Sequence, residues 1–287
     1  MFLSRDSNES VSAFLARFVP TRTTIAQGAW IYIDNPSCAS PSAAGAQDLN
    51  TQRPNWELAV PAATQILSTL AGQLASTPTL TLARQRQLRQ STTAALKHVA
   101  TQHHATIGKW ILFYPHAQVD QAWTRVATAT AAGTLGVAAK VNTTTPAHAN
   151  GERTYVICVY THDFNDRADV RRVLVQLFWL GLTPAGLAFH DEEGIATKIV
   201  DHKLPSASCT WKPDLYTYLG LDTGNPWGIA PTLYRWQEFL PPKSTAISSK
   251  TRRASDVGDD DGHVIATSKR SRSNENEKVV LVEGVDF

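Results

Sequence analysis

Residues 211–219 (WKPDLYTYL) combine side chains suited to binding a nucleotide. If this segment is a strand, alternation places four polar or aromatic residues on one side: Lys212, Asp214, Tyr216 and Tyr218. Tyrosine rings can stack on bases, which is worth about 1–3 kcal/mol per base, and a lysine adds a salt-dependent contact with phosphate. The alternative is that both tyrosines are half-buried on an open sheet face with satisfied hydroxyl groups, since tyrosine is common in strands.

Lys140 and Trp227 are two further candidates for contacts with a ligand. Lys140 ends a predicted strand whose residues 136–139 are small and apolar, which leaves room for a ligand to approach the lysine. Alternatively, Lys140 is a charge that protects the edge of a sheet. Trp227 lies in the segment Asn225–Gly228, which its proline and glycine predict to be a turn. The indole either projects from this turn as a stacking lid or fills the core.

The sequence lacks the short motifs that mark common classes of enzyme. It has no GxGxxG or GxxxxGK[ST] phosphate loop, no GxSxG elbow and no HExxH pair. His162 and Asp163 are neighbours at the end of a predicted strand, where adjacent side chains point to opposite faces, so they make a poor acid–base pair. The three cysteines are too scattered for a zinc site. We therefore expect a protein that is not an enzyme and has neither a metal nor a cofactor.

Composition narrows the class of protein further. The chain has 27 Lys and Arg against 25 Asp and Glu, and no region is strongly basic. This balance argues against a protein that grips long duplex nucleic acid, because such binding needs many phosphates to be neutralised. No run of about 18 apolar residues occurs, so we expect no contact with a membrane. The first ten residues carry charges where a signal peptide needs apolar ones, which predicts a cytoplasmic and/or nuclear location.

Composition and periodicity divide the chain into three regions. Residues 1–55 are predicted to be poorly ordered, with a short strand in 29–33. Residues 56–240 are predicted to form an α+β domain, with a helical lead-in over 56–104 and a core over 105–240. Residues 241–287 carry too few apolar and aromatic residues to offset the entropy of ordering, which predicts a disordered tail.

The core shows strand and helix patterns in the order β-α-β-β-α-β-β. Strands are predicted at 109–114, 135–141, 154–161, 211–219 and 227–236. Helices are predicted at 118–131, before Gly133, and from a cap at Asn165 or Asp166 to Gly181. This order is typical of helices packed on one face of a largely antiparallel sheet.

The tail contains two basic clusters and one β-prone run. The clusters are typical of a two-part nuclear import signal and consist of Lys250, Arg252, Arg253, Lys269, Arg270 and Arg272. Ser255 follows the first cluster in the pattern of a basophilic kinase site, where phosphorylation would add negative charge. The β-prone run either adds a strand to a small-modifier partner protein or returns to the domain as an edge strand; it consists of Val279, Val280, Leu281 and Val282.

Six segments carry a resemblance when they are taken in order. They are GKWILFYP (108–115), the helix from Val119 with Trp123, LGVAAKV (135–141), YVICVYTHDFNDRADV (155–170), WKPDLYTYLGL (211–221) and NPWGIAPTLYR (225–235). Together they resemble the basophilic-leukemia-expressed protein family, whose function is unknown. The resemblance implies the fold of the cap-binding translation initiation factors, a curved antiparallel sheet with helices on its convex face. The tryptophan pair and acidic residue of the cap binders cannot be placed in this sequence, so only the fold carries over.

Two hypotheses from different classes follow. The leading one is a non-enzymatic RNA- or nucleotide-binding module that uses Lys140, Lys212, Tyr216, Tyr218 and Trp227. The alternative is a protein-interaction adaptor, in which the helical N-terminal region and the tail recruit protein partners. An enzyme that processes RNA ends would need a convergent set of His, Asp and Lys, which the sequence does not reveal.

Overall fold

The computed structural model describes residues 1–38, 53–76, 80–183, 189–190, 196–197 and 208–239. All of these residues belong to one compact unit, Met1–Pro241. The predictions for the basic clusters, Ser255 and the run Val279–Val282 lie outside the described residues.

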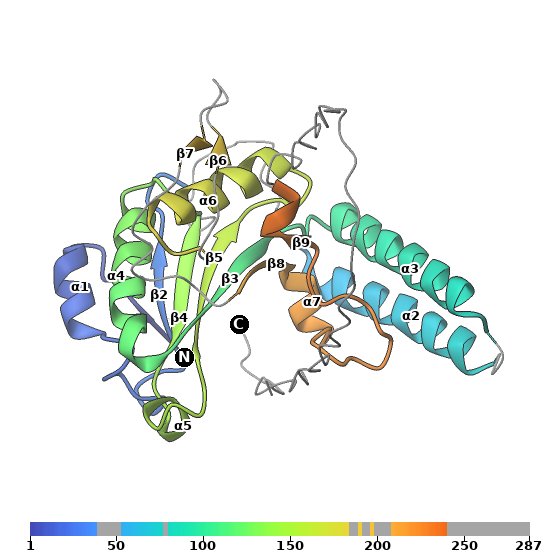
Figure 1. Ribbon diagram of the computed structural model, residues 1–287, viewed down its shortest axis with the longest axis horizontal. Helices are drawn as coiled ribbons and strands as arrows, with labels where there is room; N and C mark the ends of the chain where they lie inside the picture. Colours follow the sequence, from blue (N-terminus) through green and yellow to red (C-terminus); the bar gives the residue numbers. More distant parts are fainter. Residues whose placement is uncertain (39–52, 77–79, 184–188, 191–195, 198–207, 240–287) are drawn as a thin grey trace, which may run out of the picture. The chain divides into compact units, whose positions relative to one another are not determined.

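Seven strands form one open, mixed sheet that is mostly antiparallel (Figure 1). Its order is β1-β2-β4-β5-β3-β8-β9, in which β1 and β2 are parallel and the other neighbours are antiparallel. These strands are β1 (Phe2–Ser4), β2 (Trp30–Asp34), β3 (Gly108–Tyr114), β4 (Ala138–Asn142), β5 (Tyr155–Thr161), β8 (Cys209–Pro213) and β9 (Tyr234–Arg235). A separate pair is formed by β6 (Phe189–His190) and β7 (Ala196–Thr197).

Helices α4 (His116–Ala131) and α6 (Arg167–Trp179) pack on one face of the seven-stranded sheet (Figure 1). Apolar residues recur every three or four positions along α4, and this stripe, with Val119, Trp123 and Val126, is fully buried. The core therefore lies between this face of the sheet and the two helices. The prediction of an α+β fold with a largely antiparallel sheet is confirmed.

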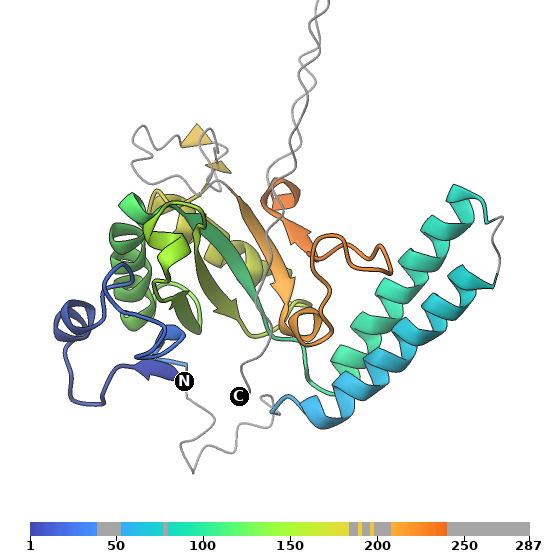
Figure 2. The same ribbon diagram turned by 90° about the horizontal axis from the view of Figure 1, so that it is seen from below.

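Residues 56–102 form a helical hairpin that consists of α2 (Trp56–Ala75) and α3 (Leu82–Gln102), which lie side by side (Figure 2). Each helix begins at a capping side chain, because Asn55 accepts from the backbone N–H of Leu58 and Thr81 accepts from that of Arg84. By length and composition alone, α2 is apolar enough to cross a membrane. Helices in protein cores meet the same test, and the buried side of α2 packs on α3.

The predicted helix signals in the core are confirmed at residue level. Asp166 caps α6 by accepting from the backbone N–H of Asp169. Gly133 and Gly181 follow α4 and α6 with positive φ angles of 78° and 71°, the conformation that ends a helix and that glycine adopts without strain. The turn at Asn225–Gly228 is also confirmed, since the Gly228 N–H donates to the Asn225 carbonyl oxygen over 3.1 Å.

Two predicted strands are wrong in their extent. The segment 211–219 is a strand only to Pro213, and Asp214–Tyr218 forms the short helix α7. Proline at the helix boundary and a carboxylate in the first helical turn both favour this change of structure. Instead of a strand over 227–236, only Tyr234–Arg235 pairs with β8, and a 3₁₀ helix, η1 (Trp236–Phe239), follows. The expected alternation of side chains between the two faces of the sheet therefore holds only from Trp211 to Pro213, and not for the rest of the segment 211–219.

The N-terminal region contributes to the core, in contrast to the poorly ordered segment expected there. Residues 1–38 carry β1, helix α1 (Val11–Arg17) and β2, of which only the strand near 29–33 was predicted. Phe14 of α1 and Ile31 of β2 are fully buried in the main hydrophobic cluster. The short helix α5 (Pro146–Ala149) completes the elements between β4 and β5.

Candidate functional site

The residues of β3 alternate between the core and the opposite face of the sheet. Trp110 and Leu112 are fully buried, and the Trp110 indole N–H donates to the Val170 carbonyl oxygen of α6 over 3.0 Å. These residues therefore face the helices. Because successive side chains in a strand point to opposite faces, Lys109 lies on the face away from α4 and α6.

Strand register brings further polar residues to this same face. Lys109 of β3 lies between Tyr160 of β5 and Lys212 of β8, and Lys140 of β4 lies beside Cys158 of β5. All five residues are buried, although three carry amines. We refer to Lys109, Lys140, Cys158, Tyr160 and Lys212 as the lysine face.

Lys109 forms a closed ion pair with Asp214, the first residue of α7. Its Nζ donates to Asp214 Oδ1 over 2.5 Å and to Thr217 Oγ1 over 3.0 Å, and both charged side chains are at most 10% exposed. Burial by itself lowers the pKa of Lys109, but the Asp214 carboxylate raises this pKa above its usual value. The ammonium group is therefore held charged by its partner, and the pair is part of the structure of the face.

Lys212 forms a second ion pair, with Asp222 in the loop after α7. The Lys212 Nζ lies 2.5 Å from Asp222 Oδ1, and the lysine side chain is 6% exposed whereas the aspartate side chain is 42% exposed. Burial lowers the pKa of Lys212, although the Asp222 carboxylate acts in the opposite direction. The charge on Lys212 thus depends on an anion that is itself only partly buried.

Lys140 is surrounded by aromatic rings. Its Nζ lies 4.4 Å from the ring centroid of Trp30, 5.5 Å from that of Phe2 and 5.6 Å from that of Tyr160. Such distances are typical of cation–π contacts. Burial lowers the pKa of Lys140. Trp30 and Phe2 therefore belong to the candidate site, although neither residue was predicted from the sequence to contact a ligand.

Tyr160 and Cys158 of β5 lie between Lys109 of β3 and Lys140 of β4. The Tyr160 ring lies under two ammonium groups, since Lys109 Nζ is also 5.6 Å from its centroid. Burial raises the pKa of the Cys158 thiol and that of the Tyr160 hydroxyl, so both groups are neutral at physiological pH. A neutral buried thiol is a poor nucleophile. The lysine face therefore offers cations and aromatic rings, which suit binding better than covalent chemistry.

Of the three aromatic residues predicted beside the lysines, Tyr216 and Trp227 lie elsewhere, whereas Tyr218 borders the lysine face, since its hydroxyl interacts electrostatically with Asp214 and Tyr160. Tyr216 is in the main core, and its hydroxyl has no hydrogen-bond partner among the described residues. The Tyr218 ring packs on Trp56 of α2, with ring centroids 4.7 Å apart. Trp227 is half-buried against the main core, and its carbonyl oxygen accepts from Arg89 Nε of α3 over 2.9 Å. Of the five predicted ligand contacts, only Lys140 and Lys212 share the lysine face.

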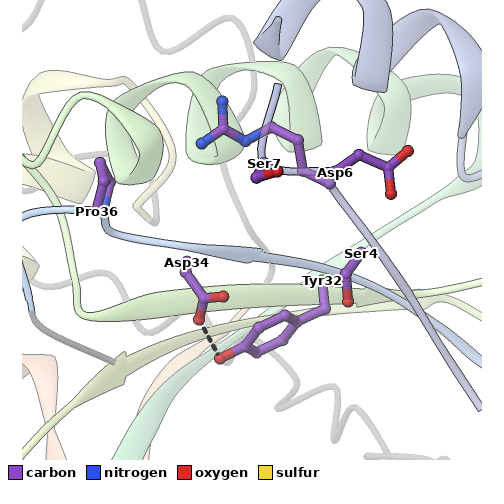
Figure 3. Close-up of a pocket in the computed structure, with 7 residues that line it drawn as sticks. Ser4, Asp6, Ser7, Tyr32, Asp34 and Pro36 are labelled. Atoms are coloured by element: carbon purple, nitrogen blue, oxygen red, sulfur yellow. Dashed lines mark hydrogen bonds between the residues drawn. The ribbon is translucent and has the colours of Figure 1, made fainter. Parts of the chain in front are cut away.

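A polar pocket of about 240 Å³ lies at the β1–β2 edge of the sheet (Figure 3). Ser4, Arg5, Asp6, Ser7, Tyr32, Asp34 and Pro36 line it. The Tyr32 hydroxyl donates to Asp34 Oδ1 over 2.6 Å, and Tyr32 is the strand partner of Lys140. The pocket therefore borders the lysine face and could hold a small part of a ligand that extends from it.

Sequence signals for the missed residues exist in retrospect. Lys109 is the one charged residue of β3, and the pairing of β3 with β5 puts it beside Tyr160. No group of three or more His, Cys, Asp or Glu side chains suited to a metal ion occurs within the part of the chain that the structure describes.

The fold and this face define an α+β protein with an open, mostly antiparallel sheet, helices on one side and lysines on the other. The family described as basophilic leukemia-expressed protein Bles03 matches residues 3–187. The chain belongs to this family. The matched range includes Lys109, Lys140 and Tyr160, whereas Lys212 and Asp222 lie beyond it.

Proposed function

We propose that this protein is a non-enzymatic module that binds RNA or a nucleotide on the lysine face. The observation that carries the proposal is that Lys212, Lys140, Tyr160 and Trp30 gather on the sheet face opposite α4 and α6, with the Lys109–Asp214 ion pair between Tyr160 and Lys212. Phosphate groups pair with ammonium groups, and bases stack on aromatic rings.

We further propose that the fold is of the cap-binder type. Support comes from the helices on one face of an antiparallel sheet and from the family membership. In this proposal the lysine face corresponds to the ligand-bearing side of the sheet. A preference for capped over uncapped RNA is not part of the proposal, because the aromatic residues found here surround the protein's own Lys140.

The test is a titration of the full-length protein with fluorescent guanosine and adenosine nucleotides, capped RNA and uncapped RNA at several salt concentrations. We expect saturable binding that weakens as salt rises, because phosphate contacts release counterions. Lys140→Ala should weaken binding, whereas Arg84→Ala on the exposed part of α3 is the matched control for loss of one positive charge. Absence of binding to every one of these ligands by a folded sample would refute the proposal.

A protein-interaction adaptor is the second candidate, and the helical hairpin favours it. Leu58 of α2 and Leu82 of α3 are 55% and 79% exposed, although leucine is usually buried. If the hairpin recruits a protein partner, Leu58→Glu and Leu82→Glu should abolish the capture of that partner and leave nucleotide binding unchanged. Capture that survives both changes would count against the hairpin as the recruiting surface.

A further inference from the structure

The two ion pairs of the lysine face differ in how accessible their carboxylates are. Asp214 is 10% exposed and has Lys109 as its partner, whereas Asp222 is 42% exposed. Both lysines are nearly buried, with side-chain exposures of 8% for Lys109 and 6% for Lys212. Only the Lys212 pair therefore combines a buried cation with an anion that already contacts solvent.

The main chain at Asp222 is held independently of its side chain. The Asp222 N–H donates to the Gly220 carbonyl oxygen over 2.9 Å. Its own carbonyl oxygen accepts from the Asn225 backbone N–H over 3.1 Å and from Asn225 Nδ2 over 2.8 Å. The carboxylate can consequently leave Lys212 by a side-chain rotation into solvent, without opening the loop.

When the carboxylate leaves, a cationic position remains. Lys212 then lacks its described counter-ion, and Lys109 with Asp214 forms a neutral pair in the adjacent register position. The negative charge of Asp222 also raises the pKa of Lys109, so this carboxylate acts on the amines of both Lys109 and Lys212. A buried ammonium group without an anion is costly, so a phosphate that took the place of the carboxylate would be strongly favoured.

We propose that Asp222 is a displaceable internal anion that occupies the phosphate subsite of Lys212, and that a phosphate group of the bound nucleotide replaces it. This inference rests on the proposed function. It assigns the phosphate contact to Lys212 and gives Asp222 the role of a positioning residue that lowers affinity for weakly charged ligands. Lys109 keeps Asp214 throughout and contacts no ligand.

The test compares the full-length protein with Asp222→Asn, using a fluorescent guanosine triphosphate and competition by inorganic pyrophosphate. Removal of the competing carboxylate should tighten binding of both by at least about fivefold, because even an exposed ion pair is worth about 1 kcal/mol and the Lys212 side chain is only 6% exposed. Glu152→Gln, an exposed carboxylate in the α5–β5 loop, is the control for the same change in net charge. Asp222→Ser is the second variant, in case Asp222→Asn does not fold.

A double-mutant cycle adds a readout that a merely structural role would not produce. Lys212→Met should remove the gain caused by Asp222→Asn, because the anion then has no cation to reach. If the protein binds nucleotide and Asp222→Asn leaves affinity unchanged or weakens it, the inference is wrong while the proposed function stands. If neither the original protein nor the variant binds any phosphate-bearing ligand, both are wrong. Binding by the variant alone would support the inference.

Discussion

Each of the three lysines on the lysine face has a different environment. Lys109 has a buried carboxylate, Lys212 has a partly exposed one, and Lys140 lies among aromatic rings. Lysines that look equivalent in sequence are therefore expected to have different effects on stability and on binding.

The Lys109–Asp214 pair should behave as a structural unit. Asp214→Ala leaves a buried ammonium group without its partner and is expected to lower the free energy of unfolding by about 3–5 kcal/mol. The double variant Lys109→Met/Asp214→Ala removes both charges, so it should recover at least half of that loss. Urea denaturation followed by circular dichroism measures both free energies of unfolding. If the double variant lost as much stability as the two single variants together, Lys109 and Asp214 would not act as a pair.

Lys140 should give the stability a distinct pH dependence. Burial lowers its pKa in the folded state, and an unfolded lysine titrates near 10.4. Between these two pKa values the unfolded chain binds more protons, so this lysine's contribution makes the free energy of unfolding rise with pH. Lys140→Met lacks that contribution. The stability of the variant minus that of the original should therefore fall as the pH is raised from 7 through the lowered pKa of Lys140 and past about 10.4, in total by about 1.4 kcal/mol per unit by which the pKa is lowered.

Urea denaturation at each pH measures this difference, and Arg86→Met on the exposed part of α3 is the control, since its difference should stay constant. A constant difference for Lys140→Met as well would show that Lys140 has a normal pKa.

The sequence singled out two of the three lysines of the lysine face, because local context sufficed for them. Lys140 and Lys212 stand out against small or aromatic neighbours within their own segments. Tyr216 was predicted beside Lys212 but lies in the main core, because alternation was extended past Pro213 into a helix. Lys109 was missed because its environment depends on pairing with β5 and β8, which no local pattern specifies.

At the scale of elements, β8 leaves no room for a side chain on β3 at Gly108. A Cβ atom at this position would overlap the Trp211 ring and the Lys212 carbonyl oxygen. Gly108→Ala should therefore lower the free energy of unfolding by about 1–3 kcal/mol, because the close-packed core must shift. Since Lys212 moves with β8, the variant should also weaken nucleotide binding.

Gly72→Ala is the matched control, because a Cβ atom at that position of α2 meets nothing within 4 Å. Alanine is the better helix former, so this change should raise the free energy of unfolding by about 0.5–1 kcal/mol. Thermal unfolding of both variants measures the contrast. Equal effects of the two substitutions would rule out the close approach at Gly108.

Helix α6 shows why some elements could be predicted well. Its cap Asp166, its apolar stripe and its terminating glycine are all local signals, and each is found as expected. The segment 221–233 shows the opposite case, since it is held by Asn225 side-chain bonds to Ile229 rather than by a strand ladder.

At the scale of the whole molecule, the fold extends beyond the range that the family match covers. The match ends at residue 187, whereas β8 begins at Cys209 and places Trp211 in the core. The Trp211 indole N–H donates to Thr161 Oγ1 over 3.1 Å, and its ring packs on Phe164 and Tyr234. The matched range is thus not a complete folding unit.

A fragment of residues 1–187 should therefore fail to fold, because β3 loses β8 and a large aromatic cluster is opened. We expect no cooperative thermal transition and no near-ultraviolet circular dichroism signal from this fragment. A fragment of residues 1–239 keeps β8 and β9 and should unfold cooperatively. Cooperative unfolding of the shorter fragment would show that β8 is dispensable.

The position of β3 between β5 and β8 has a consequence for synthesis on the ribosome. β3 ends at Tyr114, and its second partner begins only at Cys209. At typical elongation rates of 5–20 residues per second, roughly 5 to 20 s separate the two. For that interval one hydrogen-bonding edge of the nascent β3 strand lacks its native neighbour, and such edges recruit other chains. β3 is therefore one of the strands of the emerging protein that chaperone protection would need to cover.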